Sequence, residues 1–336
     1  MKGPYTTDFY EGQRSGSRRS ADRVVPLIID LIGPRSVVDV GCGVGTWLAS
    51  FSHHGIKDVI GVDGEYVDRK LLQIPKEQFK ACDLTQPIGL ERRFDLVCCL
   101  EVAEHLDAAF AGTLVDSLAG LGPVVLFSAA APYQGGTNHV NEQWPEYWAK
   151  LFQKRGYSPI DYVRPTIWND PDVEWWYAQN ALLFAAQAHL DSLGTEHVLY
   201  RLALATAKSP LSLVHPRCYT EKALALRLCK DVMGIVPPNE SLILVAESVA
   251  SEFPLRNALP FLERDGVYWG HPATGQEAIQ ELERMRTSGC SFIIFSWLSF
   301  WWLDYYSDLR EYLRTHFKCA NDDECFIAFD LRRTPS

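Results

Sequence analysis

Short hydrophobic runs alternate with helical patterns along the first 186 residues, and this alternation predicts an α/β fold. The run at 36–40 is valine-rich and too short for a helix, which is typical of a strand buried on both faces of a parallel sheet. Six further strands are expected, at 58–63, 78–84, 94–100, 123–128, 161–164 and 178–185. We therefore predict a doubly wound sheet of about seven strands with helices on both faces.

A second alternation begins beyond residue 215. Thr274 as N-cap, Glu277 three residues later and Gly289 as a stop predict a helix over 274–288. The other elements expected here are helices at 220–233 and 300–316 and strands at 242–245, 291–296 and 325–330. A chain of 336 residues suits two domains. The expected organisation is a first domain over 1–186, a linker over 187–215 and a smaller α/β domain over 216–336.

Glycines occupy every second position after the first strand, at 41, 43 and 45. They precede an expected helix start at Thr46, so bare backbone N–H groups can approach a ligand there. A phosphate loop would need Gly-Lys-Ser/Thr, and Thr46 stands where a dinucleotide fingerprint has its third glycine. Asp39, two residues before the first glycine, favours a positively charged ligand over a pyrophosphate. An NAD-dependent oxidoreductase is therefore disfavoured.

With its preceding acid, this turn resembles the first motif of the class I S-adenosylmethionine-dependent methyltransferases, and the resemblance extends in order over residues 36–130. It implies a Rossmann-like fold, S-adenosylmethionine as cofactor and S-adenosylhomocysteine as product. Asp63, at the tip of the second strand, is placed to hold the ribose diol. Asp83 matches the position that contacts the adenine amino group. The cofactor-binding residues expected in this core are Asp39, Gly41, Cys42, Gly43, Asp63, Gly64, Asp83, Leu84 and Glu101.

The N-terminal segment allows two interpretations. Residues 1–20 are polar and glycine-rich and lead into an amphipathic helix over 21–31. They form either a frayed terminus or a lid over the cofactor. In the lid, an arginine, with Arg18 as our candidate, pairs with the carboxylate of the cofactor.

Acceptor chemistry is expected where the fourth and fifth strands end. An imidazole suits proton removal because its ordinary pKa lies near neutral pH. The catalytic candidates are His105, His139 and Glu142, and the expected substrate contacts are His105, Tyr133, His139, Asn141 and Trp144. Glu101 with His105, or His139 with Glu142, could instead chelate a divalent cation. The clustered Asp-Asp or Asp-Asn pair that such a site prefers is missing from the sequence, so no metal is expected.

Composition narrows the acceptor and the partners. The formal net charge of −10 argues against a nucleic-acid-binding surface, and no apolar run is long enough for a membrane span. Nine scattered cysteines indicate reduced thiols and a cytoplasmic location. The expected substrate is a small molecule, methylated on a hydroxyl of a sugar, glycan precursor or secondary metabolite. N-methylation is the alternative, and the C-terminal domain could support a homo-oligomer or dock the enzyme to a biosynthetic complex.

Overall fold

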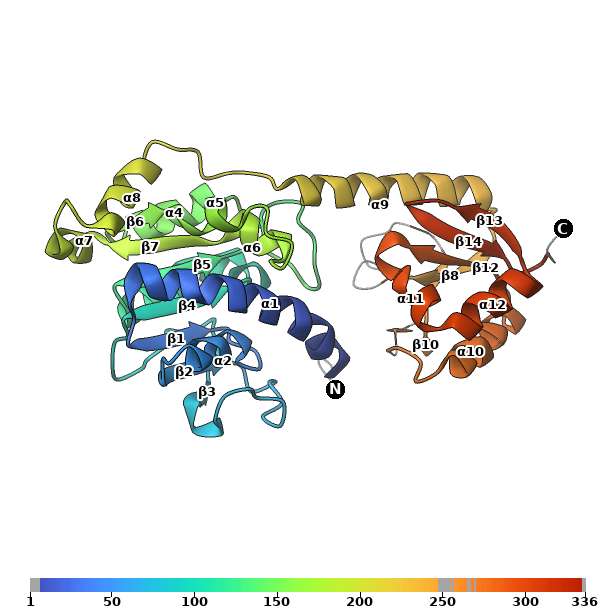
Figure 1. The fold of residues 1–336 in the computed structure, drawn as a ribbon, viewed down its shortest axis with the longest axis horizontal. Helices are drawn as coiled ribbons and strands as arrows, with labels where there is room; N and C mark the ends of the chain where they lie inside the picture. The colour runs from blue at the N-terminus through green and yellow to red at the C-terminus, as the bar shows by residue number, and fades with distance from the viewer. Residues whose placement is uncertain (1–6, 247–254, 256, 265–266, 269, 334–336) are drawn as a thin grey trace. The chain divides into compact units, whose positions relative to one another are not determined.

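The computed structural model describes residues 7–246, 255, 257–264, 267–268 and 270–333, with side chains from residue 16 onward except that of Val267. The chain divides into two compact units after Cys218. Each unit has its own sheet of strands with helices packed against it (Figure 1). None of the helices in these ranges combines the length and the apolar character that crossing a bilayer requires.

The sheet of the first unit has seven strands in the order β3-β2-β1-β4-β5-β7-β6. Their bounds are β1 Ser36–Val40, β2 Asp58–Asp63, β3 Phe79–Ala81, β4 Leu96–Leu100, β5 Val124–Ser128, β6 Tyr157–Ile160 and β7 Leu182–Ala186. All pairings are parallel except those of β7, which runs antiparallel to β5 and β6. Every residue of β1, β4 and β5 is buried, as expected of strands covered on both faces. The predicted fold class is confirmed.

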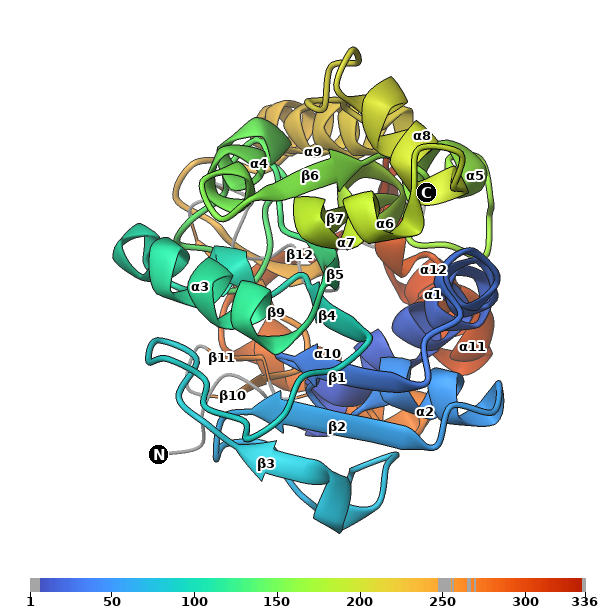
Figure 2. The same ribbon diagram turned by 90° about the vertical axis from the view of Figure 1, so that its left-hand side faces the viewer.

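Helices cover both faces of this sheet. Figure 2 shows α1 (Thr7–Ile32) and α2 (Thr46–His53) on one side and α3 (Ala111–Leu121) and α4 (Pro145–Gln153) on the other. Alternate residues of β1 face opposite ways, so Val37 joins the core beneath α1 and α2 while Val38 and Val40 join the core beneath α3 and α4. Asp39 therefore lies on the face that α1 and α2 cover.

Two of the expected strands have the wrong bounds. Residues 161–164 lead into helix α5 (Val163–Ile167). Of residues 178–185, the first three belong to helix α6 (Trp175–Asn180) and the last four to strand β7. The strands themselves are β6 and β7, shifted by a few residues. Short apolar runs do not separate a buried helix from a buried strand, and tertiary packing decided both cases here. Helix α1 also begins earlier than the expected 21–31.

The expected linker at 187–215 is part of the first unit. It contains α7 (Gln187–Leu193) and α8 (Val198–Thr206). Leu190, Leu199 and Ala203 belong to the hydrophobic core of the first unit, and the Thr206 hydroxyl accepts a hydrogen bond of 2.8 Å from the Asp161 amide. The segment is not a linker because its apolar residues pack against β6 and β7.

The second unit is built on a five-stranded sheet in the order β13-β14-β12-β8-β9. These strands are β8 Ser241–Val245, β9 Ala258–Pro260, β12 Cys290–Ser296, β13 Lys318–Asp322 and β14 Phe326–Asp330, with a small hairpin of β10 Glu263–Arg264 and β11 Val267–Tyr268. Its helices are α9 Pro216–Ile235, α10 Gly275–Thr287, α11 Trp301–Tyr305 and α12 Ser307–His316. The Thr274 hydroxyl caps α10 by accepting from the Glu277 amide at 3.2 Å. The helix expected over 300–316 is broken at Tyr306, whose backbone is non-helical and whose hydroxyl donates to Pro272 O at 2.7 Å.

Candidate active site

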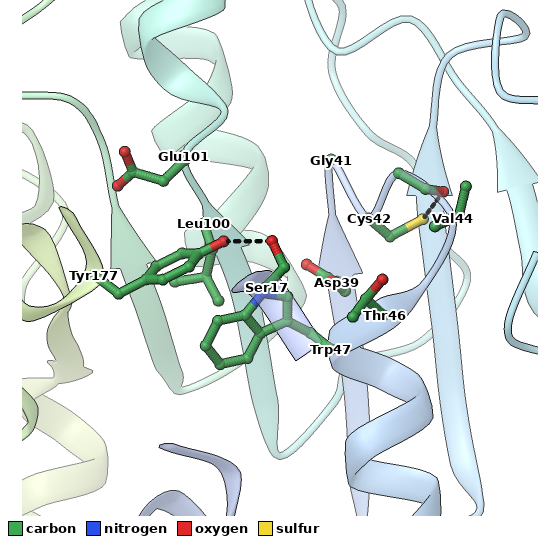
Figure 3. A pocket seen from close by; sticks show the side chains of 11 residues that line it. Ser17, Asp39, Gly41, Cys42, Val44, Thr46, Trp47, Leu100, Glu101 and Tyr177 are labelled. Carbon is green, nitrogen blue, oxygen red and sulfur yellow. Dashed lines mark hydrogen bonds between the residues drawn. The ribbon is translucent and has the colours of Figure 1, made fainter. Parts of the chain in front are cut away.

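The strand order reverses between β1 and β4, because the chain continues from β1 to β2 on one side and from β4 to β5 on the other. Ligands of doubly wound sheets bind outside the carboxyl ends of the strands at such a switch point. A cavity of about 120 Å³ lies there. Figure 3 shows the side chains around it, and its lining comprises Ser17, Asp39, Gly41, Cys42, Gly43, Val44, Thr46, Trp47, Leu100, Glu101 and Tyr177.

The turn after β1 requires its glycines. Gly41, Gly43 and Gly45 have φ angles of 80°, 52° and 83°, in the left-handed region that side chains with a Cβ rarely adopt. A Cβ on Gly41 would also overlap the side chain of Val102. The Gly41 amide donates to Val62 O at 2.7 Å, which ties the turn to the end of β2. The backbone is thus brought to the cavity wall immediately before α2.

Two buried carboxyl groups support this turn. Asp39 lines the cavity, and burial together with the nearby Asp63 raises its pKa to about 8. Asp63 accepts hydrogen bonds from the Gly43 amide at 2.6 Å, the Gly64 amide at 2.7 Å and the Tyr66 hydroxyl at 2.5 Å. Burial raises the pKa of Asp63, and these three donors oppose the rise. Asp63 therefore braces the glycine turn and does not line the cavity in this conformation.

The other expected cofactor residues lie at different distances from the cavity. Cys42 lines it, and Gly64 lies next to Asp63. Asp83 is exposed beyond β3, where its carboxylate accepts from the amide and hydroxyl of Thr85, and neither it nor the buried Leu84 lines the cavity. The adenine contact of Asp83 and the cofactor contact of Leu84 stay predictions.

Helix α1 covers the cavity, but through a residue that sequence analysis did not single out. Ser17 lines the cavity, and its hydroxyl lies 3.4 Å from the hydroxyl of Tyr177 on α6. Figure 3 shows the hydrogen bond between these two hydroxyls among the lining side chains. Arg18 instead forms an ion pair with Asp22 at 2.9 Å, one turn along the same helix. Residues 7–20 of the N-terminal segment are helical, residues 1–6 lie outside the described part, and Arg18 does not reach the cavity in this conformation.

Glu101 is held at the cavity by a buried polar network. Its backbone has a φ of 53°, uncommon for a residue other than glycine and often found at functional sites. Its carboxylate accepts from Gln134 Nε2 at 2.9 Å and Asn180 Nδ2 at 3.2 Å. Burial raises the pKa of Glu101, and hydrogen bonds from Ser128, Gln134 and Asn180 oppose that rise. Gln134 and Asn180 were missed because their approach to Glu101 depends on tertiary packing.

The expected catalytic residues are brought together beside Glu101. The rings of His105 and His139 meet edge to face with centroids 4.9 Å apart. His139 Nδ1 lies 3.0 Å from Glu142 Oε1, and the Glu142 carboxylate also accepts from the amides of Tyr133 at 2.8 Å and Gly135 at 2.7 Å. Burial opposes ionisation of Glu142, but the His139 contact and both amides leave its pKa lowered. Burial and His139 lower the pKa of His105 to about 4.

The expected substrate contacts are spread more widely. Asn141 is buried, and its backbone amide donates to the Glu104 carbonyl at 3.0 Å, so Asn141 helps to fix the loop after β5. Tyr133 and Trp144 are exposed at 86% and 40% of their surface. Contact of these three residues with an acceptor stays a prediction.

This geometry first defines a class of protein, namely a doubly wound domain with a cavity beside a glycine turn at its switch point. Residues 13–161 match the family model described as a methyltransferase domain. These residues of the first unit thus form a methyltransferase domain, in agreement with the expected enzyme class. No curated protein sequence matches the chain.

Solved structures with similar coordinates include several methyltransferases. One is an O-methyltransferase family protein from Burkholderia thailandensis, at 16% identity and a TM-score of 0.37, covering 52% of this chain and 59% of that one. Another is the magnesium protoporphyrin IX methyltransferase from Synechocystis PCC 6803, at 21% identity, a TM-score of 0.40 and coverage of 55% and 87%. A third is the sugar N-methyltransferase KedS8 from Streptoalloteichus sp ATCC 53650. It has 18% identity and a TM-score of 0.43, and the match covers 53% of this chain and 91% of that one. Similarity at this level does not identify a substrate.

Proposed function

We propose that this protein transfers the methyl group of S-adenosylmethionine to a hydroxyl of a small molecule, namely a sugar, a glycan precursor or a secondary metabolite. The observation that carries the proposal is the position of Glu101. Glu101 lines the cavity at the switch point, and a single 3₁₀ turn (Ala103–His105) connects it to His105. A cofactor held at this carboxylate is therefore adjacent to the imidazole pair of His105 and His139.

The proposed reaction is an in-line displacement. The acceptor oxygen forms a bond to the methyl carbon, the bond between that carbon and sulfur breaks, and the sulfur keeps the electron pair as S-adenosylhomocysteine. The acceptor proton passes to an imidazole that acts as general base, and His139 is our candidate because Glu142 binds its Nδ1 and leaves Nε2 for the proton. Holding the two reactants in line supplies much of the rate enhancement. An amine acceptor at the same place gives N-methylation, which is the alternative.

Calorimetry tests the cofactor part of this proposal. The wild-type chain is expected to bind both S-adenosylmethionine and S-adenosylhomocysteine. The Glu101→Gln variant is expected to bind both more weakly, by about tenfold or more, because a charge-assisted hydrogen bond to the cofactor ammonium is lost. Glu91→Gln, at an exposed position, is the matched control. Wild-type protein that binds neither ligand would contradict the proposal.

We propose further that the protein acts in the cytoplasm, supported by nine cysteines that are all free thiols. For the second unit we propose association with a second copy of the chain. Leu226 and Met233 lie seven residues apart on α9 and are exposed at 74% and 64%. Sedimentation of wild type against Leu226→Lys tests this, and a wild type that stays monomeric at high concentration contradicts it.

A further inference from the structure

Glu104 is a buried acid that the proposed reaction does not use. Its side chain is completely buried, at 0% exposure. Within the part of the chain that the structure describes, neither of its carboxylate oxygens has a hydrogen bond of ordinary geometry, although the Glu101 carboxyl and the backbone of Ala130 lie close to it. A polar group without a partner is costly to bury, and an exception of this kind calls for an explanation such as a bound ion.

Two imidazoles meet this carboxylate. Glu104, His105 and His139 each offer one ligand atom, and the three atoms lie within 4.8 Å of one another. The approach of His139 is built into the backbone. The Glu104 carbonyl accepts hydrogen bonds from the Val140 amide at 2.8 Å and the Asn141 amide at 3.0 Å, which tie the loop after β5 over the turn after β4.

The surroundings of His139 match those of a metal-binding imidazole. Glu142 binds Nδ1 at 3.0 Å, which fixes the ring and leaves Nε2 as the ligand atom. Metal-binding histidines commonly pair their second nitrogen with a carboxylate in this way. Glu142 is itself held by the amides of Tyr133 and Gly135, so the orientation of the imidazole is supported from a second layer of contacts.

We propose that Glu104, His105 and His139 bind a divalent transition-metal cation beside the cofactor cavity. One carboxylate and two imidazoles suit the first-row series from Mn²⁺ to Zn²⁺ better than Mg²⁺ or Ca²⁺, which prefer oxygen ligands. Three protein ligands leave coordination positions open, as in catalytic metal sites. Glu104 lies three residues after Glu101, which lines the cavity.

The open positions indicate a substrate class, and this step rests on the proposed function. An acceptor with adjacent hydroxyls can occupy two of them. The cation lowers the pKa of the bound hydroxyl, whose proton passes to water, and the resulting oxygen attacks the methyl carbon as the carbon–sulfur bond breaks. The metal then replaces the imidazole as the group that activates the acceptor.

Direct metal binding tests the site without any acceptor. The full chain, stripped with a chelator and titrated with Co²⁺, is expected to bind one equivalent with a visible absorption band of bound Co²⁺. Glu104→Gln and His139→Ala are expected to weaken binding by tenfold or more, in line with the loss of a ligand. Glu104→Gln keeps the size of the side chain, and its thermal unfolding checks that the fold is intact.

His53 and His54 provide the matched control. Their rings also meet edge to face, with centroids 5.5 Å apart, but none of the buried carboxylates among the described residues joins them in a cluster. His53→Ala should leave Co²⁺ binding unchanged. Binding that is equal in wild type and Glu104→Gln, or lost only in His53→Ala, overturns the proposal.

The outcome is separable from that of the proposed function. S-adenosylmethionine binding is measured on the stripped protein, so a chain that binds the cofactor but not Co²⁺ overturns the metal site alone. A chain that binds Co²⁺ but neither S-adenosylmethionine nor S-adenosylhomocysteine overturns the proposed function, while the proposed metal site is retained.

Discussion

Asp39 is buried beneath the glycine turn, and burial together with Asp63 raises the pKa of its carboxyl to about 8. Between the usual pKa near 4 and this value, the folded chain keeps a proton that the unfolded chain has lost. Such a group lowers the free energy of unfolding as pH rises, by up to about 1.4 kcal/mol per pH unit. Asp39→Asn should therefore reduce the loss of stability between pH 5 and 8.

Urea unfolding of the cofactor-free protein at several pH values in that window measures this slope. Asp83→Asn is the control, because Asp83 is exposed and hydrogen bonds from Thr85 lower its pKa below the window. A pH slope equal to that of wild type would show that Asp39 is ionised in the folded state.

Gly41 allows a second test at the residue scale. Gly41→Ala places a Cβ in the left-handed region and against Val102, whereas Gly55→Ala meets the same backbone strain (φ 98°) in open space. Both should lose about 1 kcal/mol from backbone strain, and Gly41→Ala about 1–3 kcal/mol more from overpacking. Denaturant titration measures both, and only Gly41→Ala should also lose cofactor binding. Equal effects in the two variants would contradict a tight turn.

The sequence located the cavity residues that lie within one local pattern. Asp39, Gly41, Cys42 and Gly43 share a strand-turn motif, and they line the cavity together. Ser17, Tyr177 and Glu104 could not be found in this way. Ser17 on α1 and Tyr177 on α6 meet only through tertiary packing, and the complete burial of Glu104 depends on the segments that pack around it.

At the scale of elements, Arg164 on α5 joins segments that are distant in sequence. It is fully buried, and it pairs with the Asp161 carboxylate at 2.6 Å. Its Nη1 also donates to the carbonyls of Leu211 at 2.6 Å and Gln179 at 3.2 Å. One guanidinium thus attaches α6 and the chain after α8 to the sheet.

Arg164→Met should therefore destabilise the first unit by about 3–5 kcal/mol, because Asp161 loses its partner in a largely buried position. Arg201→Met is the control, since its pair with Glu196 is exposed and such pairs contribute about 1 kcal/mol or less. Thermal and urea unfolding compare the two. Similar losses in both variants would contradict a structural role for the buried guanidinium.

The elements were predictable where pattern and burial agree. The valine-rich β1, β2 and β5 were located within a residue because a strand buried on both faces needs a continuous apolar run. The aromatic run at 175–177 does not distinguish a buried helix from a buried strand, and it forms part of α6. Strand β13 was missed because its mostly exposed, polar residues, Lys318–Asp322, show no alternation.

At the scale of the whole molecule, the cofactor chemistry is concentrated in the first unit. In the second unit, the aromatic residues Trp302 and Tyr306 belong to the core, since only 1% and 4% of their surface is exposed. A methyltransferase that keeps its cofactor site within residues 1–218 does not need the second unit for cofactor binding. Where the first unit ends then becomes a question that truncation can answer.

The boundary expected from sequence, near residue 187, and the observed division after Cys218 predict different results. A chain ending at Gln187 lacks Leu199, which belongs to the core. It also lacks the amide of Ser212, which donates to Glu146 at 2.7 Å, and that of His215, which donates to Gln179 at 2.8 Å. Gln179 in turn contacts Asn180 at 3.2 Å, one of the two residues that hold Glu101.

We therefore expect residues 1–218 to unfold cooperatively and to bind S-adenosylmethionine with the affinity of the full chain. Residues 1–187 should melt at a lower temperature and bind the cofactor weakly, because apolar core contacts are lost and the support of Glu101 is loosened. Circular dichroism melts and calorimetry on both truncations give the comparison. A 1–187 fragment as stable as 1–218 would place the end of the first domain near residue 187, as expected from the sequence. A folded 1–218 fragment that fails to bind would show that the cofactor site requires the second unit.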